Sequence, residues 1–535
     1  MNNLRILDLA IIALYLAAMI GVGVYFSRKN SNPEQYSSAS GKIPGWAIGL
    51  SIYATFLSSN TFLGVPGKAF GTNWNALVFS ISMPLAAWVA ARYFVPFYRA
   101  TGEISAYTHL EKRFGSWART YAVVCFLLTQ LARIGSIFFG IALTLQALTG
   151  FSMEVIMLVT GVSIIIYTVL GGIEAVIWTE VVQGVIKTAG ALLILYLVVS
   201  NLPGGLAKVV EIGQHDNKFS LGGFSGDFTQ STFWVVLLYG FFINLNNFGV
   251  DQNYVQRYHT ATSAKQAAKS IWLCVQVYLP ASLLFFVIGS ALYAYYQVHP
   301  ELIEAVKLKV AAEKLPLTAT AAQLTQAAAQ LQPADYGDKV MPHFIVTKVP
   351  PGFVGLLVSA ILSAAMSTIS SGMNASATVF VADIYERYFQ SGSGLGMRQT
   401  MRLLHIGTVV VGLMGMGTGI AMIGVKSVLD VWWELSGIFT AGMLGLFLLA
   451  VVSRQTRNHE ALLATIIGVL VILWMTFSPN LPAGLAMFRN PLHKSMIIVV
   501  GTLTIFLLGL LFARLRKSRN SAPANADAAL KQTVY

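Results

Sequence analysis

Thirteen apolar segments follow one another along the chain, and most have about the 20 residues that an α-helix needs to cross a bilayer. Inside a bilayer every backbone N–H and C=O needs a partner, so such segments form helices. Only 11% of the 535 residues are charged, whereas a soluble domain has about a quarter. The sequence therefore predicts an all-α polytopic membrane protein. The segments lie near residues 5–26, 44–67, 74–98, 118–148, 154–171, 174–200, 231–257, 268–298, 352–385, 401–424, 428–453, 459–478 and 494–514.

The distribution of basic residues predicts which side of the membrane each loop faces. Thirteen spans place the two chain ends on opposite sides. With the N-terminus outside, the inner loops and tail hold twenty Lys and Arg residues and the short outer segments hold seven. Cytoplasmic loops collect Lys and Arg, so we expect the N-terminus outside and the C-terminus inside. The same distribution accounts for the net charge of +13 without a nucleic-acid partner.

The chain is predicted to form one transport domain. It comprises residues 1–520, with an extra first span at 5–26, core spans from about 44 to 453 and two further spans within 459–514. The first span is followed by basic residues rather than preceded by them, so we expect it to be retained rather than cleaved as a signal peptide. The loop at 299–350 is predicted to lie outside the membrane, with helix in its Ala- and Gln-rich run at 301–332. The sequence predicts that residues 516–535 form a disordered cytoplasmic tail.

The second apolar segment has a polar middle. Ala54–Phe62 reads ATFLSSNTF, and Gly64-Val65-Pro66-Gly67 follows it. Unwound backbone at membrane depth is tolerated only where it lines a site or is packed in protein. The sequence therefore predicts a helix that breaks near Leu57–Thr61 and lines a site.

The seventh apolar segment carries polar residues near its inner end, among them Asn244, Asn247 and Asp251. Interrupted helices that lead two inverted repeats are a feature of secondary transporters. Spans two to six and seven to eleven are therefore predicted to form two inverted five-helix units. Asn247 and Asn253 are candidates for the inner side of a binding pocket.

A polar helix face is predicted far along the chain, in the ninth segment. Ala364, Ser367, Thr368 and Ser371 have the spacing i, i+3, i+4, i+7 and share one face. Sodium is a hard cation that prefers several oxygen ligands, and hydroxyls from this face plus carbonyls from the broken helix provide them. Packing of small residues between helices is the alternative.

Glu180 lies within the sixth segment, and a carboxylate inside a membrane marks a candidate functional site. With Ser370 and Ser371 it is a candidate ligand of a second cation, or it carries a proton. The alternative is a carboxylate near the inner interface that pairs with a nearby base.

Arg133 lies near the middle of the fourth segment. Its guanidinium is always protonated and matches a carboxylate, so we expect an anionic partner. That partner is either supplied by the protein, with Glu434 as the candidate, or it is the solute. Lys187 is interpreted as lying nearer a segment end, with its ammonium reaching the interface.

Motifs of soluble enzymes are missing from the sequence. There is no P-loop, HExxH or GxSxG pattern, and no stretch has the composition of a soluble nucleotide-binding domain. The two cysteines, Cys125 and Cys274, lie inside apolar segments and form no zinc or disulfide pattern. A channel or a transport-inactive sensor is an alternative to a carrier, although no repeated selectivity filter is visible.

Several motifs make the chain resemble the solute:sodium symporters, which include the sodium–glucose and sodium–sialic acid transporters. The resemblance covers nearly all of the chain. It rests on Pro44–Ala47 (PGWA), Ala54–Ser59 (ATFLSS), Gly171–Gly184 (GGIEAVIWTEVVQG), Val255–Tyr258 (VQRY) and Ser367–Ser371 (STISS). It implies a LeuT-like core of two inverted five-helix repeats, alternating access and a coupling sodium ion.

The resemblance also implies the site residues. The main sodium site would use the carbonyls of Ala54, Leu57 and Ala364 and the hydroxyls of Ser367 and Thr368. A second sodium site in some members would use Glu180, Ser370 and Ser371. The family usually has Asp in place of this Glu, so one or two sodium ions are expected.

The context of Arg133 and of Gly171–Glu180 is most similar to the sialic acid branch, in which a matching arginine holds the solute carboxylate. Ser58 and Thr61 would face the same pocket. Phe56 and Ser80 depart from the family pattern. We therefore predict a monomeric sodium symporter in the cell inner membrane that imports an acidic sugar such as sialic acid. A neutral sugar or a small monocarboxylate is the alternative solute.

Overall fold

Helices make up nearly all of the described structure, a computed structural model that covers residues 5–27, 33–103, 105–315, 319–389, 396–425 and 427–521. Within these residues there is no β-strand, and one isolated parallel bridge joins Ile43 to Ala261. The predicted all-α class is therefore confirmed.

Ten of the described helices are long and apolar enough to cross a membrane, and the count reaches 12 if two bent pairs are added. The continuous ones are α1 (Ile6–Ser27), α9 (Ser116–Thr149), α10 (Met153–Ser200), α14 (Ala264–Val298), α18 (Phe353–Val379), α20 (Met397–Ala421), α21 (Val428–Val452), α22 (Asn458–Phe477) and α23 (Met496–Ser521). The tenth runs through α5 (Leu77–Ile81), α6 (Met83–Val89), a π-helical turn η4 (Ala90–Phe94) and α7 (Val95–Thr101).

Two helices are broken where the sequence predicts interruption. The first consists of α3 (Gly45–Phe56), the π-helical η2 (Asn60–Gly64) and α4 (Val65–Gly71), with a bend of 56°. The second consists of α12 (Phe233–Gly249) and α13 (Gln252–Thr260), with a bend of 44°. At the first break Leu57 leaves helical geometry (φ −88°, ψ 78°), and at the second Asp251 caps α13 by accepting from Asn253 N. Both interruptions predicted from the polar residues are confirmed.

The longest helix, α10, is divided by a glycine. A straight helix of 48 residues would be about 70 Å long, far more than the ~30 Å hydrocarbon core. Gly172 has φ +57° and ψ −166°, which only glycine adopts without strain. The parts on both sides pack on α18, because Tyr167 donates to Met366 O at 2.9 Å and Glu180 accepts from Ser371.

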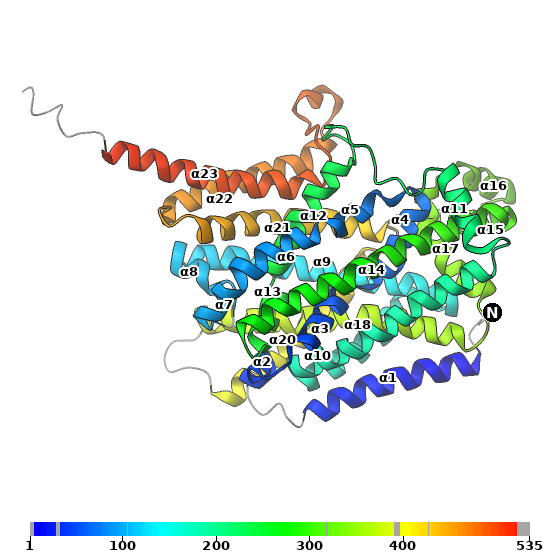
Figure 1. The fold of residues 1–535 in the computed structure, drawn as a ribbon, viewed down its shortest axis with the longest axis horizontal. Helices are drawn as coiled ribbons and strands as arrows, with labels where there is room; N and C mark the ends of the chain where they lie inside the picture. Colours follow the sequence, from blue (N-terminus) through cyan, green and yellow to red (C-terminus); the bar gives the residue numbers. More distant parts are fainter. Residues whose placement is uncertain are drawn as a thin grey trace, which may run out of the picture.

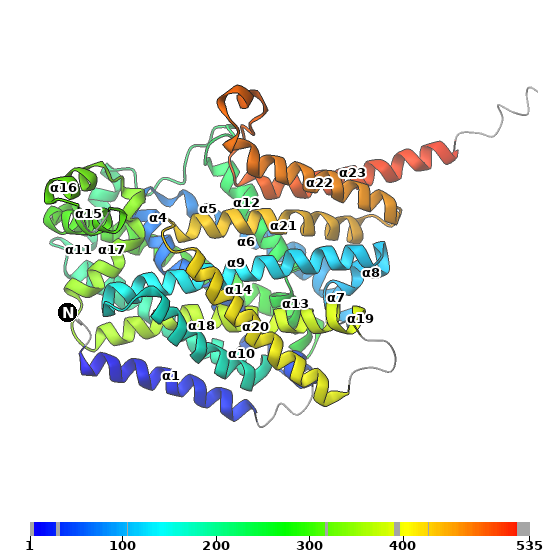
Figure 2. The same cartoon turned by 180° about the vertical axis from the view of Figure 1, so that it is seen from behind.

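The helices lie side by side, and the start of α1 and the end of α23 lie at opposite ends of the bundle (Figures 1 and 2). The predicted helical run in the 299–350 loop is present. It forms α15 (Pro300–Lys314) and α16 (Ala321–Gln330), followed by α17 (Pro333–Lys348), at the end of the bundle where α1 begins.

Shorter helices complete the described fold. They are α2 (Pro33–Ser38), α8 (Thr108–Phe114), α11 (Gly205–His215), α19 (Glu386–Tyr388), the π-helical η5 (Phe380–Tyr385) and the 3₁₀ turns η1 (Ala39–Gly41), η3 (Trp74–Ala76), η6 (Ser478–Asn480) and η7 (Ala483–Phe488). At the C-terminal end α23 continues to Ser521, so residues 516–521 of the predicted tail are helical. Residues 522–535 of that tail lie outside the described residues.

The extra first helix is held to the start of α18 by one carboxylate. Asp8 is 1% exposed, and its Oδ1 accepts from Gly352 N and Gly355 N, both at 2.8 Å. A negative charge at a helix N-terminus pairs with its free N–H groups and its dipole. Asp8 therefore fixes α1 against the core.

We expect Asp8→Ala to lower the free energy of unfolding by about 1–3 kcal/mol, because it leaves two buried N–H groups without an acceptor. The melting temperature of the detergent-purified protein measures this. Asp8→Asn keeps an acceptor oxygen, so its melting temperature should fall less. Glu301→Ala, which removes an exposed carboxylate, serves as the control. An unchanged melting temperature for Asp8→Ala would contradict this role.

Candidate functional site

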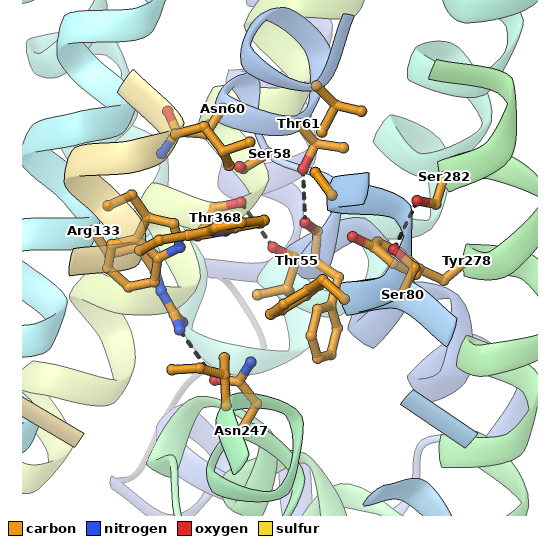
Figure 3. Close-up of a pocket in the computed structure, with 18 of the residues that line it drawn as sticks. Thr55, Ser58, Asn60, Thr61, Ser80, Arg133, Asn247, Tyr278, Ser282 and Thr368 are labelled. Atoms are coloured by element: carbon orange, nitrogen blue, oxygen red, sulfur yellow. Dashed lines mark hydrogen bonds between the residues drawn. The ribbon is translucent and has the colours of Figure 1, made fainter. Parts of the chain in front are cut away.

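A cavity opens beside the break in α3–α4. Its lining includes Thr55, Phe56, Ser58, Asn60 and Thr61 from the broken helix, Ser80 from α5, Arg133 from α9, Asn247 from α12, Tyr278 and Ser282 from α14, Thr368 from α18, and Trp432 and Trp433 from α21. Figure 3 shows the labelled side chains converging on one space, with Arg133 and the Ser80–Ser282 pair on opposite sides in this view. Helices from both halves of the chain therefore build this cavity.

Four of the five residues predicted to bind solute line this cavity: Ser58, Thr61, Arg133 and Asn247. Asn253 does not. Its side-chain amide donates to Asp251 Oδ1 at 2.7 Å, at the N-terminus of α13. The structure therefore brings the first four together and gives Asn253 a local role at the second helix break.

Arg133 is buried in the cavity wall, with 6% of its surface exposed. Its Nη2 lies 3.3 Å from Asp251 Oδ2 and 3.4 Å from Asn247 Oδ1, and the guanidinium lies over the Trp432 ring at 4.9 Å. Among the described residues, only Nη2 of this guanidinium has such polar partners. The remaining N–H groups are available for an anion in the cavity.

Glu434 is not the partner of Arg133. It pairs instead with Lys494 at 3.1 Å, and both side chains are more than two-fifths exposed. The prediction that named Glu434 is wrong because the carboxylate at the helix break, Asp251, lies closer to the guanidinium.

Aromatic rings and hydroxyls make up the rest of the cavity wall. Phe56 packs against Phe248, Tyr254 and Tyr278 with ring centroids 4.9–5.5 Å apart. The hydroxyls of Ser80 and Ser282 are 2.8 Å apart. The two departures from the family pattern, Phe56 and Ser80, therefore both face this cavity.

The broken helix and the polar face of α18 meet as predicted from the sequence. Ser367 Oγ donates to Ala54 O at 3.1 Å and Thr368 Oγ1 donates to Thr55 O at 3.0 Å. Ala364 O accepts from Ser367 Oγ at 3.3 Å. The structure thus gathers the five residues predicted to bind sodium around the break.

An ammonium group lies among these oxygens. Lys187 Nζ donates to Ala54 O at 2.6 Å, to Leu57 O at 2.9 Å and to Ser367 Oγ at 2.9 Å. The lysine has no exposed surface. The expectation that its side chain reaches the interface is wrong, because residue 187 lies well inside the second part of α10 and faces α3 and α18.

Glu180 also has a side-chain cation as its partner. Arg257 Nη2 lies 2.9 Å from Oε1 and 2.8 Å from Oε2 of this carboxylate. Ser51 and Ser371 donate to the same carboxylate, and all four side chains are buried. Ser370 is not part of this group, because its hydroxyl donates to Ser367 O at 3.2 Å.

The sequence alone does not reveal the charged partners of Arg133 and Glu180. Lys187 follows Glu180 by seven residues, which places both on one helix face, and this spacing could have revealed the lysine. In the sequence Arg257 stands out only as part of the VQRY motif. Asp251 stands out only as a polar residue near a helix end, with no sign that it pairs with Arg133.

We expect Glu180→Met to destabilise the protein by about 3–5 kcal/mol, because it leaves the Arg257 guanidinium buried without its carboxylate. The double variant Glu180→Met/Arg257→Met should be more stable than the sum of the two single losses. Melting temperatures of the four detergent-purified proteins test this. Additive losses would show that the two side chains do not act as a pair.

The chain is similar to known proteins over most of its length. Residues 36–468 match the family described as the sodium:solute symporter family. The sodium/sialic acid symporter NanT of Aliivibrio fischeri is 32% identical over 498 residues, which cover 92% of this chain and 91% of NanT. The sodium/sialic acid symporter SiaT of Proteus mirabilis is 29% identical over 508 residues, which cover 94% of this chain and 96% of SiaT.

Solved structures show the same likeness. A Na⁺-coupled sialic acid symporter in its substrate-bound outward-open state has a TM-score of 0.82 at 29% identity, over 96% of this chain and 98% of that chain. The nucleobase-cation symporter Mhp1 in a closed conformation has a TM-score of 0.51 at 13% identity, over 93% of this chain and 98% of Mhp1, and shares the fold alone. With the family match over most of its length, the chain belongs to the sodium:solute symporter family.

Proposed function

We propose that this protein is a symporter that imports an acidic sugar of the sialic acid type by alternating access. The observation that carries the proposal is the buried guanidinium of Arg133 in a cavity between two broken helices. Hydroxyls of Ser58 and Thr61 and several aromatic rings share that cavity. A guanidinium matches a carboxylate, and hydroxyls and ring faces suit a sugar. The two relatives with sialic acid in their names support this solute.

The arrangement of helices supports the predicted architecture. The two bent helices each begin a set of five spans if α10 counts as two, divided at Gly172. That count gives the proposed 13 spans and a LeuT-like core of two inverted five-helix repeats. The start of α1 and the end of α23 lie at opposite ends of the bundle, which fits an odd number of spans. The basic residues then place the N-terminus outside and the C-terminus inside.

The chain is a multi-pass membrane protein. We propose that it acts as a monomer in a cell inner membrane, with the 299–350 loop outside and the final residues in the cytoplasm.

The broken helix contributes residues to both the solute position and the cation position. Ser58 and Thr61 line the cavity, whereas the carbonyls of Ala54 and Leu57 accept from Lys187 at the cation position. Thr368 touches both, because it lines the cavity and donates to Thr55 O. A change at one position therefore moves backbone that belongs to the other, which is the coupling that a symporter requires.

We expect Arg133→Ala to weaken binding of N-acetylneuraminate by about 10- to 100-fold, because hydrogen bonds to a charged group contribute about 1.5–3 kcal/mol. Calorimetric titration of the detergent-purified protein measures the Kd. Arg92→Ala, on an exposed arginine beside Tyr93, is the matched control. An equal loss of affinity for a neutral sugar would favour a neutral sugar as the solute. Unchanged binding of N-acetylneuraminate would remove Arg133 from the solute site.

Asp251→Asn should tighten binding of N-acetylneuraminate, by up to about tenfold or ~1.4 kcal/mol. The Asp251 carboxylate lies beside Arg133 and competes with an anionic solute for the guanidinium. Asparagine keeps an oxygen that can cap α13. A weaker affinity in this variant would indicate that Asp251 orients Arg133 for the solute rather than competing with it.

A further inference from the structure

The cation position between the α3–α4 break and α18 is already filled by a side chain. An ammonium has three N–H donors and no acceptor. Lys187 Nζ has three oxygen partners at 2.6–2.9 Å, two of them carbonyls released by the helix break. The number of donors matches the number of acceptors. A charged lysine thus satisfies the same oxygens that a bound sodium ion would need.

These residues do not fit a sodium ion while Lys187 is in place. Of the five oxygens predicted as ligands, Ala54 O, Leu57 O and Ser367 Oγ accept from the ammonium. Ala364 O and the Thr368 hydroxyl are engaged in hydrogen bonds of their own. A sodium ion would have to displace the ammonium from its three acceptors, and burying an unpaired charge costs several kcal/mol.

The second candidate position also holds a side-chain cation. Arg257 contacts both oxygens of Glu180 and donates to Ser371 Oγ at 2.6 Å. A guanidinium remains protonated at any physiological pH, so this position keeps a fixed positive charge. Of the two cations, only the lysine can release a proton.

We propose that the ammonium of Lys187 replaces sodium in this protein, and that the proton which Lys187 carries is the coupling ion of transport. This rests on the alternating-access function proposed above. On the outer side the amine takes a proton from water, and the ammonium then joins the helix break to α18. On the inner side one N–H bond breaks, the proton passes to cytoplasmic water and the nitrogen keeps the electron pair.

The neutral amine weakens this junction. It has two donors and no charge, so one of the three oxygens loses its partner. The titratable groups around it are Glu180 on α10, which pairs with Arg257 on α13, and the phenols of Tyr15 on α1 and Tyr53 on α3. The facing helix α18 carries no titratable side chain. Protonation of Lys187 is therefore the charge change that this junction can undergo.

The first test is thermal and needs no solute. The melting temperature of the detergent-purified full chain is measured from 0 to about 150 mM NaCl, with KCl keeping the ionic strength constant, since a ligand of the folded state raises stability. We expect no sodium-specific rise for the wild type. A sodium-specific rise for the wild type overturns the proposal, because sodium would then bind despite Lys187.

The second test is transport of N-acetylneuraminate into proteoliposomes that hold the wild-type protein. We expect accumulation without sodium when the outside is more acidic than the inside, and its loss with a protonophore. Accumulation that requires sodium, or exchange of solute with no response to the proton gradient, overturns the proposal. If no acidic sugar is transported under any gradient, the proposed function fails, and the thermal test still decides whether Lys187 replaces sodium.

Two variants separate a coupling role from a structural one. Lys187→Met removes the proton-binding group, and Lys187→Arg keeps a charge that does not titrate. Both should lose accumulation driven by the proton gradient, and Lys187→Arg should lose it although it keeps a positive charge. Lys208→Met, on a lysine paired with Glu211 at the surface, is the control. Proton-driven accumulation by Lys187→Arg equal to that of the wild type overturns the proposal.

Discussion

The structure depends on how the carbonyls released by the break in α3–α4 are satisfied. Leu57 leaves helical geometry within the membrane-spanning part of the protein, where an unpaired backbone group costs several kcal/mol. Lys187 and Ser367 donate to the freed carbonyls. The break therefore persists only because α10 and α18 bring donors to it, and those two helices are positioned by the same contacts.

The same constraint connects the two binding positions. On one side of the break, Ser58 and Thr61 line the cavity that also holds Arg133. On the other side, the carbonyls face Lys187. Because α3, α10 and α18 meet at three hydrogen bonds, loss of one donor alters the backbone that carries the solute-binding hydroxyls. Coupling here needs no long pathway, since the two positions are less than two helical turns apart in sequence.

Features encoded locally could be predicted from the sequence. The polar ATFLSSNTF stretch and the Gly-x-Pro-Gly that follows it identify the first break, and the spacing of Ser367 and Thr368 identifies the opposing face. Pairings between distant elements could not be predicted, because the sequence does not give the relative rotation of two helices. Arg133 with Asp251, Glu434 with Lys494 and Arg257 with Glu180 are all of this kind. Each of these pairs joins residues that lie far apart in the sequence.

Lys187 shows how a single residue can change the ion while leaving the fold unchanged. The occupancy of a sodium site depends on the sodium concentration outside. The lysine amine is covalently attached and always present at the site, so its charge depends on pH instead. The oxygens that surround the ammonium are those implied as sodium ligands by resemblance to sodium-coupled relatives. Family membership therefore predicts the ligand oxygens but not the cation that they bind. The ammonium forms as many hydrogen bonds as it has donors. Removal of its proton takes away one of these hydrogen bonds and the positive charge, which is the simplest way to open the junction. A proton is also the only ion that can leave this junction while the lysine side chain stays in place.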